Sequence, residues 1–288
     1  MTTPGPTLSR RRLRAALRRL REERQHTTEA VRKGVEWSLS KVTRIEAGSV
    51  TVSLADLHML LRFYGVDDPV EVARLLDLAR SARRRSWAAS YREYVSSAYI
   101  DFMGYEDEAS VIKHFHPVVI PGLLQCRAYA DALIRVLKTL SHDDIEVQAR
   151  VALRMERQMR VFARSGDVEL KVIIDELALQ RTIGGKVVMR EQLAHLSDMF
   201  DQPGVEIAVI PFDADVPDRP TWSFSLLEFN SGEDSPVVYL ENLPSDVALV
   251  ENDAEIESYE TVFENLWRAS VVGDKARGRL ARWQLNYR

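Results

Sequence analysis

The sequence of 288 residues contains one cysteine, Cys126, and no apolar run long enough to cross a lipid bilayer. A single cysteine excludes an intramolecular disulfide framework and any zinc site built from several cysteines. The N-terminus, Met-Thr-Thr-Pro-Gly-Pro, precedes an arginine-rich segment and lacks the apolar core of a secretory signal peptide. We therefore expect a cytoplasmic protein that does not associate with a membrane.

Recognisable catalytic signatures are also missing. No Ser/His/Asp grouping has the context of a hydrolase, and Gly184-Gly185 is not followed by the Lys-Ser/Thr of a phosphate-binding loop. His114 and His116 could place two imidazoles on one face of a strand as metal ligands, but no third ligand is spaced nearby. We expect no enzymatic activity, no cofactor and no bound metal.

Two further polar features have structural interpretations that outweigh the chemical ones. Cys126 follows Leu123-Leu124 in an expected helix, where a cysteine is more often a buried small hydrophobe than a redox sensor. Asp175-Glu176 with Arg181 would form a buried charge cluster, for which structural pairing is a better explanation than catalysis.

The two signs of charge are distributed unevenly along the chain. Residues 1–85 contain 18 Lys and Arg against 10 Asp and Glu, a net charge of +8, whereas residues 86–288 carry a net charge of −12. This asymmetry is typical of a module that meets phosphate, tethered to one that does not. In the arginine-rich segment 10–24, leucines at helical spacing predict a core face, and some of the arginines remain available for backbone phosphate.

Residues 37–48, Trp-Ser-Leu-Ser-Lys-Val-Thr-Arg-Ile-Glu-Ala-Gly, predict a short helix with a defined start and end. Ser38 can cap its N-terminus, and Gly48 suits the left-handed turn that ends many helices. Val42 and Ile45 are three residues apart and can face inward together. The residues left to face outward are Leu39, Ser40, Lys41, Thr43 and Arg44. Polar and basic side chains on such a helix, beside a basic segment, are what DNA contact requires.

The flanking segments favour DNA binding over an ordinary solvated surface helix. Residues 28–35 predict a short preceding helix capped by Thr27 or Thr28, followed by the turn Val35-Glu36-Trp37. Residues 53–65 predict a following helix, in which Ser53 is the cap and Asp56 stands three residues on, as in a capping box with a shorter acid.

On these motifs, residues 9–65 resemble the helix-turn-helix domain of phage-repressor-like, Xre-type regulators. The pattern Trp-Ser-x-Ser-Lys-Val-Thr-Arg-Ile-Glu-x-Gly is similar to the recognition helix of the actinobacterial group of these proteins. In that fold the second helix of the motif enters the major groove. The family usually has a small residue where Arg32 stands and a glycine where Glu36 stands, so Glu36 is expected to adopt a positive φ at some cost.

The resemblance implies roles in DNA binding for particular residues. It places Leu39, Ser40 and Arg44 against bases, and Thr28, Ser38 and Thr43 against the DNA backbone. Lys41 is added on its charge alone.

From about Tyr99 onward, segments with strand and helix patterns alternate. The expected strands are 111–115, 168–174, 205–211, 223–229 and 237–241, the last two as a hairpin. The expected helices are 123–139, 144–165, 187–200, 255–269 and 275–285. This order predicts an α+β domain with a mixed or antiparallel sheet.

This half also resembles a known domain over nearly all of residues 98–285. The motifs that carry the resemblance stand in the same order and include Pro121-Gly122-Leu123-Leu124-Gln125, Asp175-Glu176, Gly184-Gly185, Ile210-Pro211-Phe212 and Tyr239-Leu240-Glu241. They are similar to the uncharacterised C-terminal domain of the same regulators, which are described as antitoxin-like and are often paired with a small acidic partner protein.

Together these patterns predict a multidomain protein, in which an all-α, five-helix, phage-repressor-like domain precedes an α+β domain. We expect residues 1–7 to be disordered, 8–80 to bind DNA, 81–97 to connect, and 98–288 to regulate or bind a partner. The expected function is sequence-specific transcriptional regulation on double-stranded DNA by a homodimer. The alternative is an antitoxin-type interaction protein that sequesters a small acidic partner and uses DNA binding for autoregulation.

Overall fold

The computed structural model describes residues 4–137, 144–164, 166–216, 219–232, 234–242 and 246–287. It divides into two compact units, Met1–Ala89 and Ser90–Arg288, each with a hydrophobic core of its own. The division falls inside the segment 81–97 that the sequence predicts as a connector. Within the described ranges, every helix is too short or too polar to span a membrane.

The N-terminal unit consists of helices around one core, as the sequence predicts. Its α-helices are α1 (Pro6–Glu23), α2 (Thr28–Gly34), α3 (Leu39–Glu46), α4 (Leu54–Phe63) and α5 (Pro69–Ala82). The arginine-rich helix α1 turns Leu13, Leu17 and Leu20 into the core, where they meet residues of α3, α4 and α5. The leucine stripe predicted from the sequence is therefore confirmed, and this unit is a small helical domain.

The predicted disorder of residues 1–7 is wrong for the part that the structure describes. Helix α1 begins at Pro6, a favourable residue for the first helical turn, and Thr7 is buried. The Pro4 carbonyl accepts hydrogen bonds from the Ser9 and Ser81 hydroxyls at 3.1 and 2.7 Å. These two bonds tie the start of α1 to the end of α5, an attachment across 77 residues of sequence that local composition does not reveal.

The C-terminal unit contains a mixed seven-stranded sheet in the order β6-β5-β4-β1-β2-β3-β7. Its strands are β1 (Val111–His116), β2 (Glu169–Asp175), β3 (Val205–Ile210), β4 (Ser223–Glu228), β5 (Val237–Asn242), β6 (Asp246–Val250) and β7 (Val271–Val272). Strand β1 pairs in parallel with β2, as β2 does with β3, and the remaining pairs are antiparallel. The predicted mixed sheet and the β4–β5 hairpin are thereby confirmed.

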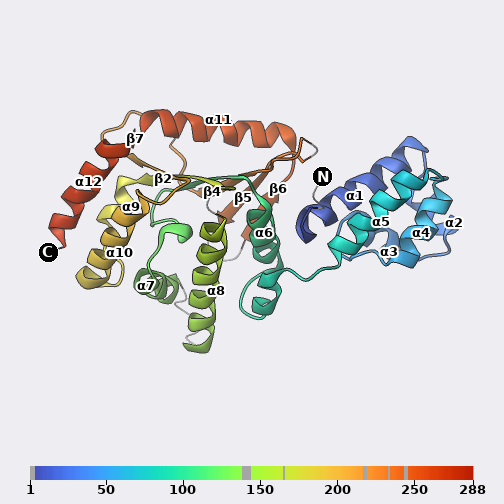
Figure 1. The fold of residues 1–288 in the computed structure, drawn as a ribbon, viewed down its shortest axis with the longest axis horizontal. Helices are drawn as coiled ribbons and strands as arrows, with labels where there is room; N and C mark the ends of the chain where they lie inside the picture. Colours follow the sequence, from blue (N-terminus) through green and yellow to red (C-terminus); the bar gives the residue numbers. More distant parts are fainter. Residues whose placement is uncertain are drawn as a thin grey trace. The chain divides into compact units, whose positions relative to one another are not determined.

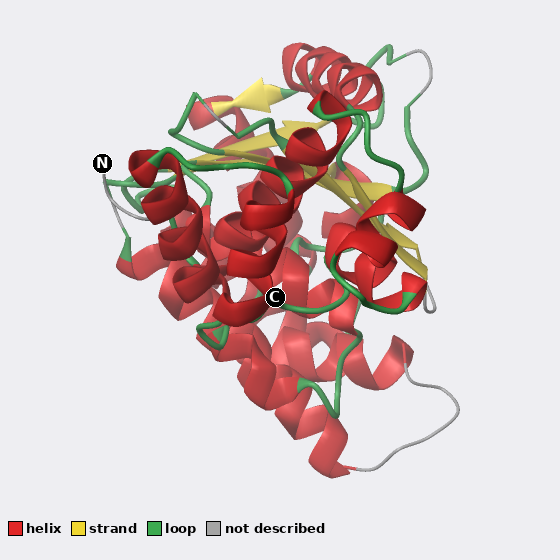
Figure 2. Ribbon diagram, turned by 90° about the vertical axis from the view of Figure 1, so that its right-hand side faces the viewer, coloured by secondary structure: helices red, strands yellow, loops and turns green. Residues whose placement is uncertain are grey.

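Helices cover both faces of this sheet (Figures 1 and 2). The short helix η1 (Trp87–Tyr91) spans the division between the units. The other helical elements of the C-terminal unit are α6 (Ser97–Glu108), η2 (Gly122–Leu124), α7 (Arg127–Leu137), α8 (Asp144–Ala163), α9 (Glu176–Gln180), α10 (Gly185–Met199), α11 (Asp253–Ala269) and α12 (Gly273–Asn286). Helix α11 lies on one face, whereas α6, α7, α8 and α10 lie on the other (Figure 1). Because side chains alternate along a strand, Phe115 packs in the core that contains α11 residues, and His114 and His116 face the opposite side.

Several elements differ from the sequence expectation. The helix expected over 123–139 is interrupted, since η2 ends at Leu124 and α7 begins at Arg127; residues 138 and 139 lie outside the described residues. Helix α6 was not expected, because five consecutive residues from Phe102 to Glu106 are buried and no amphipathic stripe marks it. The short elements α9, β6 and β7 were also missed.

Candidate nucleic-acid interface

Helices α2 and α3 form the helix-turn-helix predicted from residues 28–48. The Thr27 hydroxyl caps α2 by accepting a hydrogen bond from the Ala30 N–H at 3.1 Å, which settles the choice between Thr27 and Thr28. Glu36 has a φ of 54°, so the predicted positive-φ turn is confirmed at a residue with a side chain. The Trp37 N–H bonds to the Arg32 carbonyl at 3.0 Å, which closes the turn.

Helix α3 has the start, inside and end that its sequence predicts. The Ser38 hydroxyl accepts the Lys41 N–H at 3.2 Å, and Gly48 has a φ of 73° just beyond the C-terminus. Val42 and Ile45 are buried in the core of the N-terminal unit. The inward face therefore fixes the rotation of the helix, and the remaining residues are presented to solvent.

Four of the residues predicted to meet DNA are exposed together on α3. Leu39 is 46% exposed, and Ser40, Thr43 and Arg44 are also exposed. Among the described residues, no hydrogen-bond or ion-pair partner holds the Arg44 guanidinium, which leaves all five of its donors available. An arginine with this freedom can make the bidentate contact to guanine that is the commonest specific contact in the major groove.

Other predicted site residues have contacts within the domain. The Lys41 ammonium lies 2.7 Å from Asp56 Oδ1 and 3.8 Å from the centre of the Trp37 ring, so it joins α3 to the first turn of α4. Burial alone would raise the pKa of Asp56, but the hydrogen bonds from Lys41 and Ser53 more than offset this, and the pKa is lowered. Thr28 is half-buried in the first turn of α2. Sequence reasoning missed these tertiary contacts.

Several arginines of the basic N-terminal unit are held in ion pairs. Arg18 and Arg19 pair with Glu22 and Glu23, one helical turn along α1. Arg21 bonds to Glu46 at 2.6 Å between side chains that are mostly buried, which ties α1 to the end of α3. Positive charge is therefore used partly to fix α3 in place.

We expect Ser38→Ala to lower the free energy of unfolding of the N-terminal unit by about 1 kcal/mol, because the Lys41 N–H loses its capping acceptor. Ser38→Asp should restore most of the stability, since aspartate is also a good N-cap. The measurement is urea denaturation followed by circular dichroism at 222 nm. Equal stability of the wild type and Ser38→Ala would contradict the capping role.

The acidic pair of the C-terminal unit is structural but differs in its partners from the expectation. The Asp175 carboxylate caps α9 through the Leu177 N–H and pairs with Arg219 at 3.0 Å. Buried Glu176 accepts hydrogen bonds from the Phe212 N–H, Arg279 and the Trp283 indole at 2.8–3.0 Å. The predicted partner Arg181 takes no part; its side chain lines a cavity instead.

The remaining chemical candidates are also placed by the structure. Cys126 is buried, as expected of a small hydrophobe, and burial raises the pKa of its thiol. His114 and His116 share one face of β1, yet the described residues contain no group of three or more His, Cys, Asp or Glu that could hold a metal. Burial lowers the pKa of His114 well below its ordinary value and that of His116 to about 4.

We expect the C-terminal unit to lose stability as the pH falls from 7.5 to 5.5. Below about pH 6.5 the unfolded chain protonates these histidines, whereas folded His116 stays neutral until about pH 4, so acid favours unfolding. Each histidine contributes a slope of up to about 1.4 kcal/mol per pH unit. Urea denaturation at several pH values measures how the free energy of unfolding changes with pH, and His116→Asn should reduce this slope. An unchanged slope would contradict the lowered pKa of His116.

The fold and the exposed face of α3 define a helix-turn-helix protein. Residues 12–75 match the family described as a helix-turn-helix domain, which indicates DNA binding and a role in transcription regulation. Residues 99–282 match the family described as a domain of unknown function, DUF5753. Because this second match covers more than half of the sequence, the chain belongs to the DUF5753 family. Neither the curated proteins nor the solved structures gave a match.

Proposed function

We propose that the protein is a sequence-specific DNA-binding transcriptional regulator, in which residues 8–80 bind operator DNA and residues 98–288 form the regulatory domain. The observation that carries the proposal is the exposed face of α3, where Leu39, Ser40, Thr43 and Arg44 project from a helix that is capped at both ends. Residues near the N-terminus of such a helix reach base edges in the major groove. Ser38 and Thr28 are proposed to contact the DNA backbone, and Lys41 to assist by its charge.

We further propose that the active form is a homodimer, because one such module buries little surface and phage-repressor-like modules act in pairs on half-sites about 34 Å apart. We propose that the last two helices, α11 and α12, supply the interface. Most of their apolar residues serve the domain itself, since Phe263, Leu266 and Leu280 are buried and Trp283 bonds to Glu176. Leu285 is 53% exposed and remains available.

The net charge of the N-terminal unit gives the first test. We expect the logarithm of the association constant for a duplex of about 25 base pairs to fall linearly with the logarithm of salt concentration, each phosphate contact adding about 0.9 to the slope. Fluorescence anisotropy of the labelled duplex, titrated with the protein between 50 and 300 mM salt, measures this salt dependence. A flat response would remove the electrostatic basis of the proposal.

Specificity requires a second measurement. Genome-wide mapping of bound DNA in the native host should return a shared motif with two half-sites, one helical turn apart for a dimer. If the bound DNA shares no motif while binding depends steeply on salt, the protein binds DNA without sequence preference. That result would refute the sequence-specific part of the proposal.

A further inference from the structure

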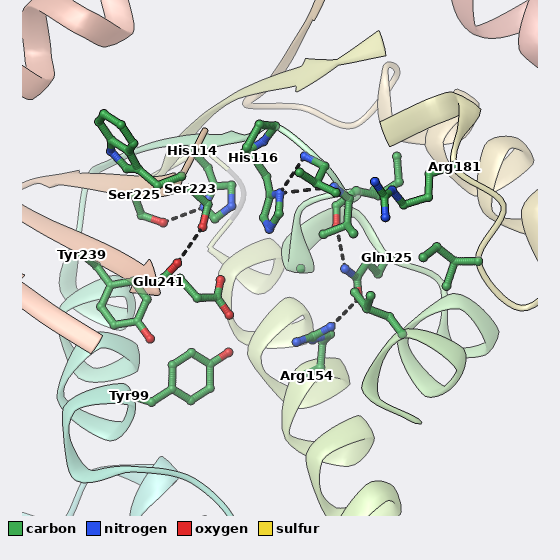
Figure 3. A pocket seen from close by; sticks show the side chains of 18 of the residues that line it. Tyr99, His114, His116, Gln125, Arg154, Arg181, Ser223, Ser225, Tyr239 and Glu241 are labelled. Carbon is green, nitrogen blue, oxygen red and sulfur yellow. Dashed lines mark hydrogen bonds between the residues drawn. The ribbon is translucent and has the colours of Figure 1, made fainter. Parts of the chain in front are cut away.

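A cavity of about 580 Å³ lies within the C-terminal unit. Its walls come from β1, β4, β5, α6, α7, α8 and the segments 117–125, 181–183 and 221–222, and His116 lines it at the carboxyl end of β1 (Figure 3). Strand β1 is parallel to its neighbour β2, and antiparallel β4 lies on its other side. In sheets with parallel strands, ligands often bind beyond the carboxyl ends of those strands. The volume is also that of a small-molecule site.

The two histidines of β1 present polar atoms to this cavity. His114 is 8% exposed, and its Nδ1 lies 2.6 Å from the Ser225 hydroxyl. Its Nε2 is buried and has no hydrogen-bond partner within the described part of the chain. His116 Nδ1 accepts the N–H groups of Val118 and Val119, both at 3.2 Å. Its proton therefore resides on Nε2, which becomes a neutral donor. A buried polar atom without a partner is costly unless a ligand or water satisfies it.

The charged residues that line the cavity are Arg154, Arg157, Arg181 and Glu241. The positive charge of Arg157 is compensated by Glu106, to which it makes two hydrogen bonds at 2.6 and 2.7 Å. The charge of Arg154 is not compensated in this way: Arg154 donates to the amide oxygen of Gln125 at 2.5 Å, and its buried Nε has no partner among the residues that the structure describes. Among the described residues, Arg154 and Arg181 have no carboxylate within ion-pair distance.

These polar groups lie on opposite sides of the cavity. Figure 3 shows Arg154, Gln125 and Arg181 on one side, and Glu241, Tyr239 and Tyr99 on the other. Much of the remaining lining is apolar. It includes Val118, Val119, Ile120, Leu133, Val136 and Ile183. A guanidinium in a partly dry site favours a carboxylate or phosphate, with which it can form charge-assisted hydrogen bonds. Glu241 favours a hydroxyl or amine at the opposite end of the ligand.

We infer that this cavity binds a small organic anion, whose carboxylate or phosphate is held by Arg154 and Arg181, whose apolar body lies along the aliphatic wall, and whose far end donates a hydrogen bond to Glu241. Val136, Trp222 and Arg181 are exposed residues of the lining, and the ligand would enter beside them. Only the regulatory meaning of this binding rests on the proposed function; the binding itself does not.

The test uses the full-length protein and three probes of one shape: 4-hydroxyphenylacetate, 4-aminophenyl phosphate and the uncharged 4-hydroxyphenylacetamide. At 10 mM, one or both anions should raise the melting temperature of the C-terminal unit, with calorimetric dissociation constants of about 1 mM for fragments of this size. The two anions distinguish a carboxylate site from a phosphate site. No response to either anion, or an equal response to the amide, overturns the inference.

Variants assign the binding to the cavity. Arg154→Met should weaken anion binding at least 10-fold, whereas Arg190→Met, at an exposed residue of α10 outside the cavity, should leave it unchanged. Undiminished binding in Arg154→Met overturns the assignment. If circular dichroism shows that Arg154→Met does not fold, exposed Arg181→Met takes its place, and undiminished binding there has the same force. The affinity of the wild-type protein for DNA is measured separately. If the wild-type protein does not bind DNA, the proposed function is refuted, but the anion site is not.

Discussion

Glu106→Gln is expected to lower the free energy of unfolding of the C-terminal unit by about 3–5 kcal/mol, the largest effect we predict for a single side chain. Glu106 and Arg157 are both buried, and the carboxylate accepts two hydrogen bonds from the guanidinium at 2.6 and 2.7 Å. Burial alone would lower the pKa of Arg157, but Glu106 more than offsets this and the pKa is raised, so the arginine stays charged. Removing the negative partner leaves that charge buried and uncompensated.

The neighbouring residue provides a matched control. Asp107 pairs with Arg160 on the same two helices, but both side chains are about one third exposed. Asp107→Asn should therefore cost no more than about 1 kcal/mol. The double variant Glu106→Leu with Arg157→Met should recover much of the loss, because a buried ion pair can often be replaced by apolar residues. Urea denaturation compares all three, and equal losses in Glu106→Gln and Asp107→Asn would contradict this account.

How far the sequence predicts the structure depends on the range over which each signal acts. The caps of α3 and α4, at Ser38 and Ser53, act within three residues, and both are found where they were predicted. The alternation of apolar and polar side chains predicts most strands, because this signal also acts within a few neighbouring residues. The sequence does not predict helix α6, because both its faces are covered and it therefore carries no apolar stripe.

Long-range partners could not be predicted in this way. Asp175 meets Arg219, 44 residues away, and not Arg181, which is closer in sequence. The cavity lining runs from Tyr99 to Glu241 and is assembled by the order of the strands. The sequence contains the His114-x-His116 spacing and the isolated charges, but only the fold shows that they face one cavity.

Arg44→Ala is the second large effect that we expect, and it concerns function. At the operator found by mapping, the change should cost about 1–3 kcal/mol of binding free energy and relax the preference at a single base pair, because a bidentate contact to one base is lost. Arg44 suits this role because its guanidinium is exposed and has no partner among the described residues. Anisotropy titrations on the operator and on its single-base variants measure both effects.

Two arginines of the same chain separate base recognition from simple charge. Arg18→Ala removes a positive charge from α1, where the side chain is largely exposed and pairs with Glu22, and should weaken binding evenly on all sequences if it meets phosphate. Arg190→Ala removes the same charge outside the helix-turn-helix and should change neither affinity nor specificity. Loss of affinity in Arg44→Ala with full base preference retained would place Arg44 on the DNA backbone. Identical effects of Arg44→Ala and Arg18→Ala would mean that α3 is not the helix that reads the bases.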